Sequence, residues 1–303
     1  MKIVLMSDLH LIAKTPNNRC DDILHDQWKK LEFVLSYCKK NQIYHLLQAG
    51  DFFDIPRNWE TLHQTISLLQ KYPSVKIYCV EGQHDRYMRN EDTVTNISLL
   101  HRLGFITLLK NSIHFGKFVL HGINFEDDMN IDKALDEIEL SADDYNILVI
   151  HAPISDAPLF PGHEFSKANL LIKKHKEFDL ILCGDIHKSF LEYFKGRAIV
   201  NTGSMIRRER NKYNETHTPK FMVVDLTNSV LTWESIPHNP FVKAFSQQEI
   251  IIESEVLKEF VEAILSPVSD EMDIFKRIER FINENSIDNE IHKIIMEVSG
   301  NEG

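Results

Sequence analysis

Five short segments of the sequence carry side chains that bind metal ions, and most of them follow an apolar run typical of a buried strand. They are Asp8-x-His10, Gly50-Asp51, Gly82-Gln83-His84-Asp85, His151 and Gly184-Asp185-x-His187. Polar clusters at the carboxyl ends of strands are where open α/β sheets place their chemistry. Carboxylate, imidazole and amide-oxygen donors together suit divalent ions such as Mn²⁺ or Fe²⁺, and zinc less exclusively. None of the five motifs contains cysteine, which argues against a structural zinc site.

The size of the candidate ligand set indicates more than one ion. The set consists of Asp8, His10, Asp51, Gln83, His151, Asp185 and His187. It exceeds what a single ion needs and fits a pair of ions about 3.5–4 Å apart, which clamps a phosphate and activates water for in-line attack. One carboxylate must bridge such a pair, and Asp51 is the natural candidate.

The spacing within the motifs predicts how the ligands are presented. Side chains of a strand alternate with a period of two, so Asp8 and His10 are expected on the same side of an extended segment. The same argument applies to Asp185 and His187. A glycine precedes Asp51, Gln83 and Asp185, and glycine lets the backbone turn sharply and come close to an ion.

Apolar runs and helical spacing predict the elements that position these motifs. Strands are expected over 2–7, 45–49, 75–80, 147–150 and 180–183, with shorter ones over 199–201, 221–225 and 230–236 and a hairpin around Gly116. Helices are expected from about 24 to 38 and over 60–71, 96–103, 131–140 and 167–175. The sequence therefore predicts an α/β protein.

The chain is expected to have two parts. Residues 1–236 hold all the motifs, and Pro237-His238-Asn239-Pro240 is a plausible linker because its two prolines break any element. Residues 241–303 have the pattern of a small α+β appendage, a capping or accessory domain.

The composition of the 303 residues limits the function classes. The net charge of −11 argues against a protein whose whole surface grips nucleic acid, but a local basic stripe or bound cations can reverse the sign of a pocket. No apolar run spans a membrane, no signal peptide is expected, and the four scattered cysteines suit a reducing compartment. A cytoplasmic protein is expected.

In their order, the five motifs resemble those of the calcineurin-like metallophosphoesterases, over roughly residues 1–236. Within that family the chain is most similar to the nuclease subunit of Mre/SbcD complexes, and in particular to phage-encoded versions. The segments that carry this closer resemblance are Asp51-Phe52-Phe53-Asp54, Gly82-Gln83-His84-Asp85 and Asn201-Thr202-Gly203-Ser204 with the basic cluster after it.

The resemblance implies a four-layer α/β/β/α sandwich with two divalent ions, usually Mn²⁺, with Mg²⁺, Fe²⁺ or Zn²⁺ as alternatives. By position, Asp8, His10, Asp51 and His187 would hold one ion, and Asp51, Gln83, His151 and Asp185 the other. His84 would protonate the leaving oxygen or orient the phosphate, and Asp85 would hold its ring.

Two ligand positions depart from the family pattern, which has Asn where this chain has Gln83 and His where it has Asp185. The longer Gln83 side chain requires the ion to sit further out or the loop to differ. Asp185 replaces a neutral ligand by an anion and should strengthen cation binding. For either residue, the alternative is a hydrogen-bonding role behind the ligands.

Ser204, Arg207 and Arg208 are candidates for substrate contact, the two arginines with a DNA backbone. A charge run is more often a solvated face, so that alternative remains. The resemblance also implies a separate SbcC/Rad-type ATPase subunit, because this chain lacks a Walker-type loop. It further implies a homodimer through helices near 60–71 and 96–103, although core packing would explain their apolar residues equally well.

The sequence thus predicts a two-metal nuclease that hydrolyses DNA phosphodiester bonds in repair or recombination, in the host cytoplasm if phage-encoded. One alternative is a phosphodiesterase or phosphatase for small substrates. Another is a metal-binding scaffold that has lost catalysis.

Overall fold

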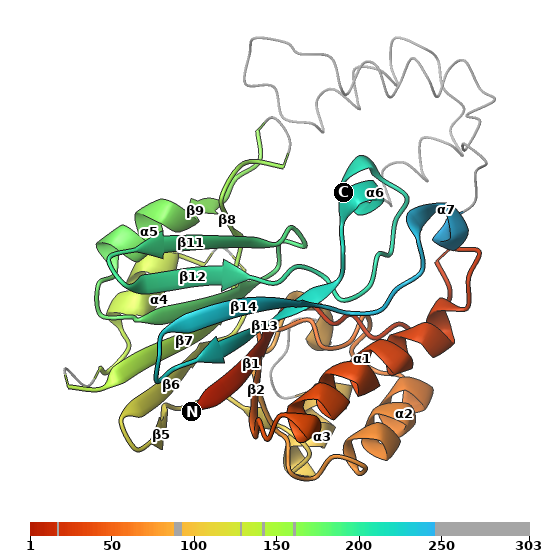
Figure 1. Ribbon diagram of the computed structural model, residues 1–303, viewed down its shortest axis with the longest axis horizontal. Coiled ribbons are helices and arrows are strands. Elements are labelled where there is room, and N and C mark those ends of the chain that lie inside the picture. Colours follow the sequence, from red (N-terminus) through yellow and green to blue (C-terminus); the bar gives the residue numbers. More distant parts are fainter. Residues whose placement is uncertain (17, 88–92, 128, 141–142, 160–161, 246–303) are drawn as a thin grey trace, which may run out of the picture. The chain divides into compact units, whose positions relative to one another are not determined.

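Two six-stranded sheets form the centre of the protein in this computed structural model, which describes residues 1–16, 18–87, 93–127, 129–140, 143–159 and 162–245 (Figure 1). The first sheet has the order β14 (Val230–Ser235), β13 (Lys220–Asp225), β1 (Lys2–Met6), β2 (His45–Gln48), β3 (Lys76–Cys79) and β4 (Thr107–Leu108). The second has the order β11 (Phe190–Phe194), β12 (Arg197–Asn201), β10 (Leu180–Gly184), β7 (Tyr145–His151), β6 (Phe118–Ile123) and β5 (Ile113–Phe115).

Each sheet contains a set of neighbouring strands that run parallel. In the first sheet β1 pairs in parallel with β2 and β2 with β3, while β13 is antiparallel to β1. In the second sheet β6, β7, β10 and β12 form a parallel set. A small parallel pair, β8 (Ile154–Ser155) and β9 (Ser166–Lys167), follows β7. The carboxyl ends of the parallel strands therefore collect the loops that carry the motifs.

Helices connect the strands on the outer faces. They are α1 (Ile23–Lys40), α2 (Trp59–Leu69), α3 (Asn96–Arg102), α4 (Ile131–Asp136), α5 (Ala168–Lys174), α6 (Lys212–Thr216), α7 (Phe241–Ala244) and the 3₁₀ turn η1 (Gln83–Asp85). Side-chain caps fix several of the starts: Asp22 accepts from the backbone N–H of His25, and Asn58 accepts from that of Thr61 at 2.8 Å.

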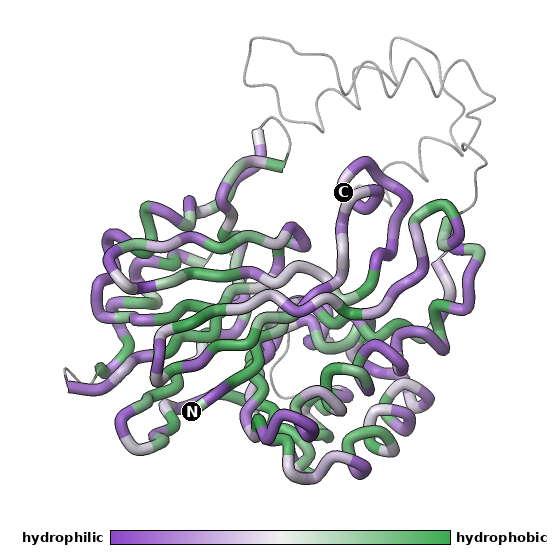
Figure 2. The backbone as a smooth tube through the Cα atoms, in the orientation of Figure 1, coloured by the Kyte–Doolittle hydropathy of each residue, from purple (hydrophilic) through white to green (hydrophobic). Residues whose placement is uncertain are grey.

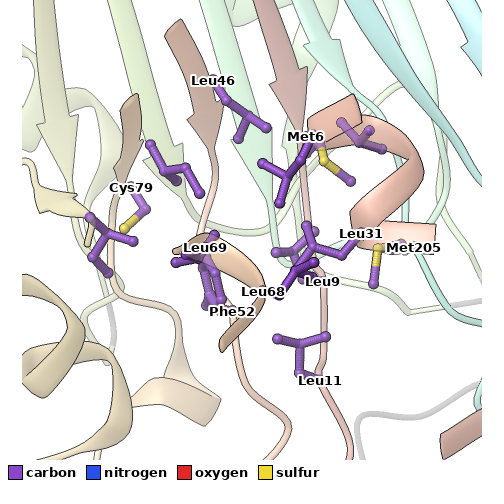
Figure 3. Packing of buried hydrophobic residues seen from close by; sticks show 14 of the residues in the cluster. Met6, Leu9, Leu11, Leu31, Leu46, Phe52, Leu68, Leu69, Cys79 and Met205 are labelled. Carbon is purple, nitrogen blue, oxygen red and sulfur yellow. The ribbon is translucent and has the colours of Figure 1, made fainter. Parts of the chain in front are cut away.

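Alternating strand side chains supply two different cores. In β1, Ile3 and Leu5 face the second sheet, while Val4 and Met6 face α1, α2 and α3. Figure 3 shows the second of these clusters, where Met6 and Leu46 from the sheet meet Leu31 and Leu69 from the helices. Strand apolarity on both faces is typical of covered parallel sheets.

The second sheet has a helical cover of its own. Leu148 and Ile150 of β7 pack with Leu171 and Ile172 of α5, on the face opposite to the inter-sheet core. Figure 2 shows the corresponding pattern, with apolar residues concentrated along the strands and hydrophilic residues on the outer turns. The layers are therefore helix, sheet, sheet and helix, which confirms the predicted four-layer sandwich. The described residues include no helix long and apolar enough to cross a membrane.

Contacts within the chain group Met1–Ser246 into one unit and Gln247–Gly303 into another. The appendage predicted for 241–303 thus lies outside the described residues from 246 onward. Its described start, α7, belongs to the first unit, since the backbone N–H of Cys20 donates to the carbonyl of Ala244 at 2.9 Å.

A buried polar network ties the segment before α7 to the loop before α1. The guanidinium of Arg19 donates to the Asp21 carboxylate and to the carbonyl of Arg207, both at 2.8 Å. The Asn239 amide donates to Asp21 at 2.8 Å and to Asp26 at 2.9 Å. Residues 239–245 are therefore an integral part of the first unit.

Lys30 lies next to this network and is expected to make stability depend on pH. It is 4% exposed, and its Nζ donates to the carbonyl of Met205 at 3.2 Å. Burial, followed by the charges of Arg19 and Arg207, lowers its pKa from 10.5 to about 7. Between these values the unfolded chain binds more protons than the folded chain, so the free energy of unfolding rises with pH.

Denaturant unfolding at about pH 7 and about pH 9 should show this rise, on the order of 2 kcal/mol. The variant Lys30→Met, of similar length and without the charge, should lose most of it. Equal pH dependence of the two proteins would contradict the assignment to Lys30.

Candidate metal centre and active site

The candidate ligands come from the carboxyl ends of parallel strands in both sheets. Asp8 and His10 follow β1, Asp51 follows β2, and η1 follows β3 in the first sheet. From the second sheet, His151 ends β7, and Asp185 and His187 follow β10. The structure thus brings all seven predicted ligands to one edge of the sandwich.

The backbone at four of these residues is left-handed. The φ angles are 39° at Asp8, 44° at His10, 50° at Asp51 and 90° at Asp185. Non-glycine residues adopt such angles at a cost, and they cluster at functional sites. The predicted extended backbone is therefore wrong, because β1 ends at Met6 and the chain bends at these residues. Asp8 and His10 nevertheless present their donor atoms to the same cluster, as the spacing predicted.

Two glycines are required because ligands pass close to their backbone. A Cβ on Gly82 would overlap the carboxylate of Asp51. A Cβ on Gly50 would overlap the ring of His151, and Gly50 also has a φ of 81°. These positions let the loops pack against the ligands themselves.

Asp51 lies at the centre of the ligand set. Its Oδ1 accepts from the backbone N–H of His84 at 2.9 Å. Its Oδ2 lies 3.4 Å from Nε2 of His10 and 3.6 Å from Nε2 of His151, and has no hydrogen-bond partner among the described residues. An unpaired, fully buried carboxylate oxygen between two imidazoles is placed as a bridging ligand requires.

The first half of the set contains Asp8, His10 and His187. The Nε2 atoms of the two histidines face each other at 2.9 Å. Oδ1 of Asp8 accepts from the backbone N–H of Asp185 at 3.0 Å, while its buried Oδ2 has no partner in the described chain. Three donor atoms, one from each residue, lie within 4.8 Å of one another.

By the resemblance, Gln83, His151 and Asp185 belong to the other half, and in the structure His151 also has donor atoms of Asp8 and Asp51 within 4.8 Å. Nδ1 of His151 donates to the carbonyl of Ala49 at 2.6 Å, so a neutral ring presents a lone pair at Nε2. That lone pair faces Oε1 of Gln83 at 2.6 Å. Nε2 of Gln83 donates to Oδ1 of Asp185 at 2.8 Å.

These contacts fit divalent cations. Two acceptors that face each other, as in Gln83 and His151, repel unless a positive charge lies beside them. The buried, unpaired oxygens of Asp8 and Asp51 are likewise stabilised by a positive charge beside them. The hydrogen bond from His151 to a backbone carbonyl is also the arrangement that orients metal-binding histidines. The residues present therefore fit the two-ion site.

Burial sets the protonation of the histidine ligands. Desolvation, followed by the neighbouring His10, lowers the pKa of His187 to about 3. Desolvation likewise lowers the pKa of His10. Both rings are therefore neutral near pH 7, as metal ligands must be. Burial, followed by the Asp51 charge, raises the pKa of Asp8, and a bound cation would oppose that shift.

The backbone of Asp54, not the carboxylate of Asp85, holds the ring of His84. Nδ1 of His84 donates to the carbonyl of Asp54 at 2.9 Å. Asp85 instead accepts from the backbone N–H groups of Phe52, Phe53 and Gly82, at 3.0–3.1 Å. The prediction that Asp85 orients His84 is therefore wrong. In the turn η1, successive side chains point in different directions, so adjacency in sequence does not place the two together.

Arg207 and Arg208 are neighbours in the sequence, but one lies in the interior and the other at the site. Arg207 is 3% exposed and donates to the carbonyls of Asn214 and Asn239, so it is a structural residue and the prediction that it contacts DNA is wrong. Ser204 is also buried and donates to the carbonyl of Ile206, which leaves it no exposed surface for substrate. Arg208 reaches the site, where its Nη1 lies 2.5 Å from Oδ1 of Asp54.

A cavity of about 360 Å³ adjoins the ligands. Its lining includes Asp185, His187, Lys188, Arg208, Asn211 and Tyr213. The hydroxyl of Tyr213 donates to the carbonyl of His187 at 2.9 Å and so braces the ligand loop. The cavity provides space for part of a substrate beside the ions.

Sequence reasoning missed Asp54 and Tyr213 as site residues. Asp54 could have been found as a carboxylate three positions after a predicted ligand, whereas Tyr213 carries no local signal. His121, which precedes Gly122 near the end of β6, does not belong to the site. Its ring contacts Ser112 at 2.8 Å and Asn146 at 3.0 Å inside the second sheet.

The solved structures that match this chain share little sequence with it, and no curated protein matches it. TT1561 of Thermus thermophilus has a TM-score of 0.49 at 14% identity, covering 78% of this chain and 99% of that one. A dimetal phosphatase from Danio rerio has a TM-score of 0.48 at 9% identity, with coverage of 81% and 99%. An archaeal phosphodiesterase has 0.41 at 13% identity, with coverage of 78% and 100%.

The family model for calcineurin-like phosphoesterases matches residues 1–189, the stretch that contains every candidate ligand. Members of this family hydrolyse phosphoester bonds with divalent metal ions. The chain belongs to the calcineurin-like phosphoesterase family.

Proposed function

We propose that this phosphoesterase is a DNA nuclease of the Mre/SbcD kind, which hydrolyses phosphodiester bonds with two divalent ions. The observation that carries the proposal is the position of Arg208. Its side chain lines the cavity with Asp185 and His187 and is 32% exposed, so it can meet a phosphate there. The resemblance of the segments at 51–54, 82–85 and 201–204 to that nuclease subunit supports DNA as the substrate.

Each site residue has a role in this reaction. Bound ions would supply Lewis acidity and lower the pKa of a coordinated water. Asp54 fixes Arg208 through its carboxylate and fixes His84 through its carbonyl. Because Nδ1 of His84 is occupied, a protonated His84 is left with Nε2–H to donate to the leaving oxygen. Arg208 would compensate the charge of the phosphate, a role suited to a guanidinium.

Arg208 and Arg207 form a matched pair for testing this proposal. Arg208→Ala should weaken DNA binding and flatten its salt dependence, because one phosphate contact is lost. Arg207→Lys should leave the salt dependence unchanged, because the residue is buried. Fluorescence anisotropy with single-stranded DNA over a salt series measures both. An unchanged slope in Arg208→Ala would contradict the assigned contact.

A second candidate function is hydrolysis of small phosphodiesters, which the cavity of about 360 Å³ favours because it matches a small ligand. Mn²⁺-dependent digestion of single- and double-stranded DNA, beside a generic aryl phosphodiester, separates the two. We expect cleavage of DNA by the wild type and its loss in His84→Ala. Activity on the small diester alone would rule out the nuclease, and retained activity in His84→Ala would remove that residue from the mechanism. Inactivity on all substrates would favour the metal-binding scaffold.

The same resemblance supports two proposed partners, a second copy of this chain and a separate SbcC/Rad-type ATPase subunit. It also supports Mn²⁺ as the metal and the cytoplasm as the location. The apolar residues Leu62, Leu69, Ile97 and Leu100 of α2 and α3 are buried in this protomer's own core. A dimer in this region would therefore use their outward faces, where Trp59 is 81% exposed.

A further inference from the structure

The two halves of the metal centre present different donor atoms. In the half formed by Asp8, His10 and His187, two imidazole nitrogens lie 2.9 Å apart and are completed by carboxylates. In the other half, His151 is the one imidazole among the described residues. Its Nε2 lies 2.6 Å from Oε1 of Gln83, 3.6 Å from Oδ2 of Asp51 and 3.9 Å from Oδ1 of Asp185.

The orientation of the Gln83 amide depends on Asp185. Nε2 of Gln83 donates to Oδ1 of Asp185 at 2.8 Å, which leaves Oε1 as the atom that faces His151. A flipped amide would place its oxygen against the Asp185 carboxylate and be repelled. Asp185 therefore contributes its own oxygens and also ensures that Gln83 presents an oxygen rather than an N–H.

We propose that Gln83 and Asp185 form an interlocked pair that makes their half of the centre selective for hard divalent ions, Mg²⁺ or Mn²⁺, relative to the other half. Oxygen donors suit these ions, whereas imidazole donors suit Zn²⁺ and Fe²⁺. The two positions then differ in their preference for Mn²⁺ over Zn²⁺. This inference rests on the two-ion centre of the proposed function and does not depend on its DNA substrate.

Reciprocal exchange of donors tests the proposal on the full-length, metal-stripped protein. Calorimetric titration with Mn²⁺ and with Zn²⁺ gives the affinity ratio at each position, and Mn²⁺ paramagnetic resonance at one and two equivalents reports the filling of each position. Asp185→His should shift the ratio toward Zn²⁺ at one position by about tenfold or more. The matched variant His187→Asp should shift the ratio toward Mn²⁺ at the other position.

The proposal is overturned if Asp185→His leaves both ratios unchanged, or if the two variants alter the same position. Circular dichroism establishes whether Asp185→His folds. If it does not, Asp185→Asn keeps an oxygen that accepts from Gln83 and removes the charge. It should then lose more affinity for Mn²⁺ than for Zn²⁺, and equal losses would also overturn the proposal. Every readout of this test is metal binding. Its outcome can therefore be interpreted whether or not the protein cleaves DNA.

Discussion

Replacement of Asp51 by asparagine is expected to abolish hydrolysis and, at the same time, to stabilise the metal-free protein. Oδ2 of Asp51 lies between the imidazoles of His10 and His151, at 3.4 Å and 3.6 Å. Its loss should cost several kcal/mol of transition-state stabilisation, a decrease in kcat of about 10³-fold or more.

The gain in stability has a separate cause. The Asp51 carboxylate is fully buried, and its charge raises the pKa of Asp8. Asparagine keeps the acceptor for the backbone N–H of His84 and offers an N–H toward the imidazoles of His10 or His151. We therefore expect the metal-free variant to be more stable by about 1–2 kcal/mol.

Steady-state kinetics with Mn²⁺ and thermal unfolding in a chelator measure the two effects. The exposed Asp136→Asn serves as the matched control and should change neither quantity. A metal-free Asp51→Asn protein that is less stable than the wild type would contradict the view that the empty centre stores unfavourable charge.

Replacement of Asp85 by alanine is expected to impair folding rather than chemistry. The carboxylate accepts three buried backbone N–H groups, from Phe52, Phe53 and Gly82. Removing it leaves these donors without their acceptor, which should lower the free energy of unfolding by about 3–5 kcal/mol. Denaturant unfolding gives this value directly.

A graded series distinguishes this role from an effect on His84. Asp85→Asn can retain an oxygen where Oδ2 accepts from Phe52 and Gly82, so its stability should lie between those of the wild type and alanine variants. His84→Ala should lose activity with a change in stability of about 1 kcal/mol or less, because its ring makes one hydrogen bond to Asp54. A stable Asp85→Ala protein with low kcat would instead restore Asp85 to the catalytic machinery.

The sequence allowed the sandwich and the ligand set to be predicted because both depend on short-range patterns. Buried strands are continuous apolar runs, and each ligand lies within a few residues of such a run. The parallel order of β1, β2 and β3 then brings those ends together without further information. The helices α2 and α3 likewise follow from apolar spacing and lie within two residues of their predicted ends.

The features that could not be predicted depend on which way a side chain points and on contacts between residues far apart in the sequence. Arg207 and Arg208 are neighbours with the same charge, yet only the fold decides which one is buried under Asn239. The bracing of His187 by Tyr213 joins residues from separate loops. Of the hairpin of β11 and β12, only the end of β12 over 199–201 was predicted. Its turn at Lys195 and Gly196, with φ of 50° and 81°, is signalled weakly by a Lys-Gly pair.

The left-handed backbone at Asp8, His10, Asp51 and Asp185 has a consequence for evolution and for mutagenesis. Asp, Asn and His are the side chains that tolerate this conformation best after glycine. The residue types that bind the ions are thus also those that tolerate a left-handed backbone. Metal binding and backbone conformation therefore favour the same residues at each position. At the three aspartates, asparagine removes the charge while preserving the backbone preference, whereas alanine or valine alters both. Asparagine series are therefore the ones that isolate chemistry from folding at this centre.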